Sequence, residues 1–144
     1  MLDQNLVLDE LKKNGVTFFT GVPDSYLNGF CNHILKNAPD RTIIAANEGN
    51  AIGIASGYYF ASKEIPLVYM QNSGMGNTVN PLVSLADEHV YAVPMLLLIG
   101  WRGRPGTGDW PQHELQGEIT PGLLDIMHIP YTVLEDDNGK IGDV

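Results

Sequence analysis

Short apolar runs that alternate with helical segments constrain the fold of this chain more than any other feature. The runs cover residues 16–20, 42–46, 67–71, 95–99 and 131–134. They lack the in-out alternation of a half-exposed strand, which is typical of strands buried on both faces of a parallel sheet. We therefore predict an α/β fold, a doubly wound, mostly parallel sheet of five strands with helices on both faces.

Helical periodicity fills the segments between these runs. Leu2, Leu6, Leu8 and Leu11 form a stripe that ends at Asn14-Gly15, a typical helix stop. Asp24 or Ser25 is the expected N-cap of a second helix, which buries Leu27, Phe30, Ile34 and Leu35. Further helices are predicted over 48–62, 80–88 and 120–127, with a Gly/Pro-rich loop over 100–117.

Composition limits the class of protein. The 144 residues carry a formal net charge of −9, which disfavours nucleic-acid binding, and their number fits one domain. A single cysteine, Cys31, excludes an internal disulfide, is expected in the core, and favours a reducing, cytoplasmic setting. No signal peptide or membrane span is expected. We predict a domain over 1–134 and a linker-like tail over 135–144, so that the chain is a fragment or one subunit of something larger.

Small, polar or charged residues follow four of the predicted strands, at 21–25, 47–50, 72–77 and 100–104. Ligands of doubly wound sheets bind beyond the carboxyl ends of the strands, so one shared site is expected there. Glu48 opens a helix rich in glycine, which suits close approach of another helix or subunit. Two interpretations of Glu48 remain open: it is a first-turn acid favoured by the helix dipole, or a carboxylate that shares a proton with a ligand nitrogen.

The other polar residues also leave alternatives open. The segment 71–77 lacks the lysine of a P-loop, so it is either a simple turn or a site for a small polar ligand or an aromatic heterocycle. Asp24 is an N-cap by default, and His113 is a solvated or catalytic loop residue. Arg102 and Arg104 are surface charges or anion ligands. The remaining histidines lack ligand-like spacing, so no metal site is assigned.

Five motifs together resemble the pyrimidine-binding N-terminal domain of thiamine diphosphate-dependent phosphonopyruvate decarboxylases, with sulfopyruvate decarboxylase α subunits as close relatives. The motifs are TGVPDS at 20–25, ANEGNAIG at 46–53, MQNSGMGN at 70–77, LIGWRG at 98–103 and PQH at 111–113.

The resemblance implies roles for individual residues. Glu48 would hydrogen-bond the aminopyrimidine ring, and Asp24 and His113 would be acid/base residues. The implied cofactor neighbours are Glu48, Asn72, Ser73, Gly74 and Asn77, and the implied substrate ligands are Ser25, Arg102 and Arg104. The Mg²⁺-binding motif of the family is absent, because Gly108-Asp109-Trp110 lacks the segment that should follow it. The resemblance therefore implies that a diphosphate-binding domain or subunit holds Mg²⁺ and the diphosphate.

The expected function is one half of an oligomeric decarboxylase that converts 3-phosphonopyruvate to phosphonoacetaldehyde and carbon dioxide. Sulfopyruvate is the nearest competing substrate. The alternatives are a non-catalytic binding module that assembles with a partner and, less favoured without a phosphate loop, a flavodoxin-like nucleotide-binding domain.

Overall fold

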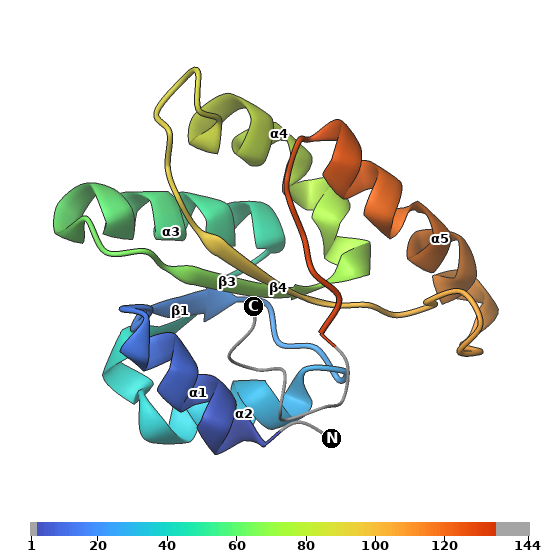
Figure 1. Cartoon of the computed structure of the whole chain (residues 1–144), viewed down its shortest axis with the longest axis horizontal. Helices are drawn as coiled ribbons and strands as arrows, with labels where there is room; N and C mark the ends of the chain where they lie inside the picture. The colour runs from blue at the N-terminus through green and yellow to red at the C-terminus, as the bar shows by residue number, and fades with distance from the viewer. Residues whose placement is uncertain (1–2, 135–144) are drawn as a thin grey trace.

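A parallel four-stranded sheet forms the centre of the computed structural model, which describes residues 3–134 (Figure 1). The strands are β1 (Phe19–Gly21), β2 (Thr42–Ile44), β3 (Leu67–Gln71) and β4 (Leu96–Gly100), in the order β2-β1-β3-β4. Every neighbouring pair is parallel. The predicted doubly wound, parallel α/β architecture is confirmed.

Helices cover both faces of this sheet (Figure 1). α1 (Gln4–Lys13) and α2 (Asn28–Asn37) lie on one face, and a 3₁₀ turn, η1 (Pro39–Arg41), precedes β2. The other face carries α3 (Glu48–Ser62), the 3₁₀ helix η2 (Asn72–Asn77), α4 (Val79–Pro81), the π-helical turn η3 (Leu82–Ala86) and α5 (Pro111–Ile126). Each face has its own core, because alternate residues of β3 point to opposite sides, with Tyr69 toward α2 and Met70 toward α3.

Several local predictions are confirmed. Asn14 ends α1, and Gly15 follows with a φ of +80°. Phe30 and Ile34 are buried, as is Cys31, and burial raises the pKa of the Cys31 thiol. In the part of the chain that the structure describes, no helix is long and apolar enough to cross a membrane. The tail predicted over 135–144 and Leu2 lie outside the described residues.

The predicted fifth strand at 131–134 is wrong. This segment has no strand pairing, and Tyr131 and Val133 are exposed. A β-rich run becomes a strand only where a neighbouring strand supplies hydrogen-bond partners, and among the described residues β4 pairs with β3 alone. The prediction that every strand is buried on both faces is also wrong for β2 at the sheet edge, where Ile43 and Ile44 are exposed.

One side chain predicted to be buried is exposed, and one expected cap is displaced. Leu35 of α2 is exposed, as is Leu6 of the predicted stripe on α1. α2 begins at Asn28, so neither Asp24 nor Ser25 is its N-cap. Asp24 caps the turn before it instead: its Oδ2 accepts from the backbone N–H of Tyr26 at 2.9 Å.

The helices of the second half also differ from the prediction. The helix expected over 80–88 ends at Ala86 and consists of α4 and the π-helical turn. The loop expected over 100–117 ends at Trp110, because α5 begins at Pro111 and places His113 in its first turn. Pro121, predicted near a helix start, where proline is favoured, lies inside α5.

A side chain from another segment makes this internal proline tolerable. Proline has no N–H, so the carbonyl of Gly117, four residues earlier, loses its helical donor. The indole Nε1–H of Trp101 donates to that carbonyl at 2.9 Å. Gly117 also permits the Gly103 backbone to pack against α5, since an added Cβ would lie 1.7 Å from the carbonyl oxygen of Gly103.

We predict that Trp101→Phe lowers the free energy of unfolding by about 1–3 kcal/mol, because the buried Gly117 carbonyl is left without a donor. Chemical denaturation of the purified chain measures this. Trp110→Phe is the matched control, because Trp110 is 68 % exposed and should leave stability unchanged. Equal stability of the two variants would contradict a role for the indole hydrogen bond.

Candidate functional site

The polar segments that follow the strands meet at the carboxyl edge of the sheet. β2 leads into α3 at Glu48, β3 into η2, and β4 into the loop 101–110. The segment after β1 reaches across to β4: the Asp24 carboxylate lies against Gly100, where an added Cβ would be 2.8 Å from Oδ2. Contacts therefore join segments from all four strand ends, although they form two groups.

The first group surrounds Glu48, the first residue of α3. Asn47 caps the helix, its Oδ1 accepting from the backbone N–H of Asn50 at 2.8 Å. The side-chain amide of Asn77 donates to Glu48 Oε2 at 2.7 Å. Among the described residues, Glu48 Oε1 has no hydrogen-bond donor. The carboxylate is thus half-buried, held through one oxygen, and able to bind a ligand through the other.

Gly74 allows η2 to approach this carboxylate. A Cβ added at Gly74 would lie 2.3 Å from Glu48 Oε1 and 2.4 Å from its Cδ, so a side chain there would displace the carboxylate from this position. Ser73 beside it is exposed, and its hydroxyl accepts from Gln71 Nε2 at 2.5 Å. The structure therefore brings three of the predicted cofactor neighbours, Glu48, Gly74 and Asn77, into direct contact.

Asn72 has a different environment from its neighbours. Its side chain is 2 % exposed, and its amide donates to the Arg102 carbonyl and to Thr120 Oγ1, both at 2.9 Å. Its Oδ1 accepts from the Arg102 backbone N–H at 3.1 Å. Asn72 therefore ties the ends of β3 and β4 to α5, and its polar side-chain atoms are paired within the chain.

The second group surrounds Arg102. Its guanidinium forms a bidentate ion pair with Asp109, with Nε 2.8 Å from Oδ2 and Nη2 2.7 Å from Oδ1. Nη1 donates to Ser25 Oγ at 3.3 Å, and the guanidinium carbon lies 5.6 Å from the centre of the Tyr26 ring. The Arg102 hydrogen bond holds the pKa of Asp109 well below its usual range, and Asp109 in turn raises the pKa of Arg102.

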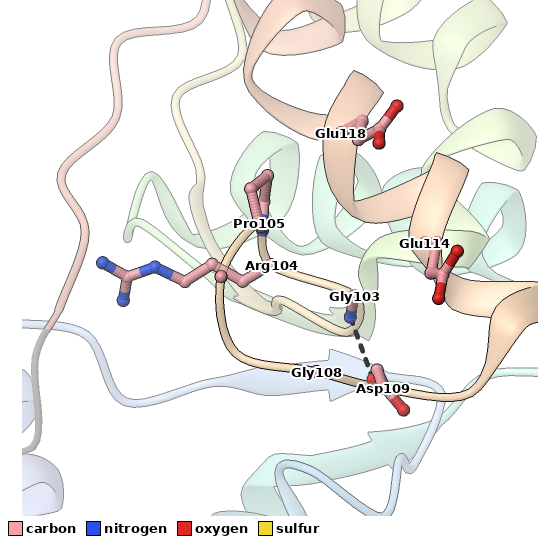
Figure 2. A pocket seen from close by; sticks show the side chains of 8 residues that line it. Gly103, Arg104, Pro105, Gly108, Asp109, Glu114 and Glu118 are labelled. Atoms are coloured by element: carbon pink, nitrogen blue, oxygen red, sulfur yellow. Dashed lines mark hydrogen bonds between the residues drawn. The ribbon is translucent and has the colours of Figure 1, made fainter.

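Arg104 lies within the loop that follows Arg102, and His113 lies in the first turn of α5, just after this loop. Arg104 stacks on Trp101 at 5.3 Å, and its guanidinium points away from Glu114 and Glu118 (Figure 2). An open hollow of about 290 Å³ lies between this loop and α5, lined partly by these two acids and Asp109. The half-buried His113 side chain has no polar partner among the described residues. Its backbone carbonyl packs against Gly103.

The sequence-predicted residues are only partly assembled. Glu48 contacts Gly74 and Asn77, and Ser25 contacts Arg102. In residues 3–134, no hydrogen bond or ion pair joins Glu48 to Asp24 or to His113. Sequence reasoning missed Asp109, whose partner Arg102 lies seven residues earlier in the loop, although an acid among glycines and prolines just before a helix was a usable signal.

The Asp109 ion pair predicts a pH dependence of stability. A carboxyl whose pKa is lower in the folded state contributes stability above its unfolded pKa, which is near 3.8, and loses it as the pH falls through the folded value. We expect the Tm difference between wild type and Asp109→Asn to be constant near neutral pH. It should shrink below about pH 4. A difference that does not change with pH, measured by differential scanning fluorimetry, would show that the charge of Asp109 is not what stabilises the fold.

The sequence of this chain is similar to those of several known proteins. Phosphonopyruvate decarboxylase of Streptomyces viridochromogenes is 37 % identical over 127 residues, which are 88 % of this chain and 31 % of that protein. The α subunit of sulfopyruvate decarboxylase of Methanococcus maripaludis is 34 % identical over 118 residues, 82 % of this chain and 68 % of that subunit. The chain thus spans about a third of the phosphonopyruvate decarboxylases that it matches, at 31 % and 33 %.

A solved structure and a family match agree with these relatives. Benzoylformate decarboxylase of Polynucleobacter necessarius has a similar fold, with a TM-score of 0.58, 24 % identity, and coverage of 71 % of this chain and 19 % of that one. Residues 4–129 match the family described as thiamine pyrophosphate enzyme, N-terminal TPP binding domain. With the fold, the relatives and a match over nearly its whole length in agreement, the chain belongs to the family of N-terminal TPP binding domains of thiamine pyrophosphate enzymes.

Proposed function

We propose that this chain is the pyrimidine-binding half of a thiamine diphosphate-dependent decarboxylase that converts 3-phosphonopyruvate to phosphonoacetaldehyde and carbon dioxide. The observation that carries the proposal is the Glu48 carboxylate. One oxygen accepts from Asn77 at 2.7 Å, while Oε1 lies beside Gly74 without a donor. An acid fixed through one oxygen presents the other in a defined direction, as a proton-sharing partner of a ring nitrogen requires.

The residues around Glu48 fit an aminopyrimidine. Such a ring offers nitrogen atoms that donate and accept protons, and a flat apolar face. Glu48 Oε1 would hold or return the proton at a ring nitrogen, and the lack of a side chain at Gly74 lets the carboxylate keep this position. Thiamine diphosphate, when bound, supplies the electron sink that decarboxylation of a 2-oxo acid needs. The buried, internally paired Asn72 would position η2 rather than contact the ring.

A second domain or subunit would complete the enzyme. The relatives from Methanococcus and two other archaea carry the name subunit alpha, which favours a separate partner, and an oligomer, for this chain too. We assign the Mg²⁺ and the diphosphate to that partner. The exposed face of α3 suits its approach, because Gly53 and Gly57 have open space around them and Phe60 beside them is 43 % exposed. Residues 1–134 would form the domain, in the cytoplasm.

The second group would bind the substrate. The Arg102 guanidinium and the Ser25 hydroxyl, which are hydrogen-bonded to each other, would together bind an anionic group. Arg104 would add a more distant positive charge. Asp24 and His113 are the proposed acid/base residues: Asp24 uses Oδ2 for the turn, and the His113 ring is not paired within the described residues. Phosphonopyruvate is preferred because the relatives named for it have the higher identities, 37 % and 35 % against 34 %.

Glu48→Gln tests the assigned role. In the enzyme assembled with its diphosphate-binding partner, thiamine diphosphate and Mg²⁺, we expect kcat to fall at least about a hundredfold, because the amide cannot exchange the proton. Release of phosphonoacetaldehyde measures it. Glu88→Gln is the control, since the Glu88 side chain is 84 % exposed, and it should keep wild-type turnover. Equal turnover of both variants would overturn the role of Glu48.

Substrate choice is tested separately. We expect kcat/KM to be higher for phosphonopyruvate than for sulfopyruvate, by about tenfold or more if the anionic tail is recognised by charge and shape. The reverse order would assign the chain to a sulfopyruvate decarboxylase. A chain that pairs with a partner but turns over neither substrate would support the non-catalytic binding module instead.

A further inference from the structure

Asp109 is the most heavily hydrogen-bonded carboxylate in the part of the chain described. Its side chain is 11 % exposed and accepts four donors: Nε and Nη2 of Arg102, the Gly103 N–H at 2.9 Å and the Trp110 N–H at 2.8 Å. The bond from Gly103 closes the loop 103–109 into a ring (Figure 2). Gly103, Gly106 and Gly108 all have positive φ, a conformation that glycine adopts without strain, and the Thr107 N–H donates to the Arg104 carbonyl at 3.1 Å inside the ring.

The same carboxylate determines where the Arg102 guanidinium points. A guanidinium has five N–H donors, and Asp109 takes one from Nε and one from Nη2. Ser25 takes a third, from Nη1. Among the described residues, the two remaining donors have no acceptor, and they belong to the terminal nitrogens Nη1 and Nη2. The guanidinium also lies over the Tyr26 ring, with its carbon 5.6 Å from the ring centre, so it has contacts along one edge and with an aromatic ring.

We propose that Asp109 is a positioning residue for substrate recognition: it orients Arg102 so that the free donors of its terminal nitrogens, beside the Ser25 hydroxyl, bind the anionic tail of the substrate. This inference rests on the proposed function. A guanidinium held along its Nε–Nη2 edge keeps its end free for a second oxyanion, and no rotamer freedom is lost when that ligand binds. Arg102 without Asp109 would retain its charge but lose its direction.

Trypsin tests on the chain whether Asp109 holds Arg102 and its loop in place. Arg102–Gly103 is a tryptic bond, whereas Arg104–Pro105 is resistant because proline follows. Asp109→Asn keeps the shape of the side chain but loses the bidentate ion pair, and should speed cleavage after Arg102 by about tenfold or more. Glu118→Gln, an acid that lines the same hollow without bonding to Arg102, should leave the rate unchanged. Peptide masses identify the bond. Unchanged cleavage in Asp109→Asn would overturn the positioning role.

Steady-state kinetics of the assembled enzyme separate positioning from simple structural support. Asp109→Asn should raise KM for phosphonopyruvate about tenfold with little change in kcat, and should leave KM for pyruvate, which lacks the anionic tail, unaltered. A general loss of structure would affect both substrates, so equal changes in both would overturn the proposal. If wild type decarboxylates no 2-oxo acid, the proposed function fails, while the trypsin result still decides whether Asp109 holds Arg102 and its loop in place.

Discussion

The close approach of η2 to the Glu48 carboxylate is the constraint on which the candidate site depends. It requires the absence of a side chain at Gly74 and a donor at Asn77. Asn72 begins the same segment and binds the backbone of Arg102 and the hydroxyl of Thr120. The position of η2 beside Glu48 is therefore linked, through one buried amide, to the loop after β4 and to α5.

The electrostatics of the site divide between its two groups. Glu48 keeps one oxygen without a donor in residues 3–134, which suits an exchange of protons with a ligand. Arg102, by contrast, is matched by Asp109 before any ligand binds, so its charge is largely balanced. The pairing gives direction rather than net attraction, and a doubly charged substrate would need further cations, from Arg104 or from a partner domain.

The sequence predicts the architecture better than it predicts the contacts. Apolar runs such as Leu67–Gln71 identify a buried parallel strand because burial on both faces leaves a direct pattern in the sequence. The run at 131–134 is also rich in β-forming residues but has no partner strand, and only the tertiary structure shows this. Pro121 predicts a helix start near residue 120, whereas α5 begins at Pro111. The proline is tolerated inside the helix because Trp101, sixteen residues before Gly117, donates to the Gly117 carbonyl. The motifs identify Glu48, Gly74 and Asn77 as residues of one site. The role of Asp109, by contrast, is evident only from its contact with Arg102 in the structure.

The most direct test of this account is a crystal structure of the chain with its diphosphate-binding partner, thiamine diphosphate and Mg²⁺. The decisive quantity is the distance between Glu48 Oε1 and the nearest ring nitrogen of the pyrimidine. We predict a hydrogen bond of about 2.6–3.2 Å, with Oε2 still bound to Asn77. A pyrimidine bound elsewhere, or a Glu48 carboxylate turned away from it, would contradict the account.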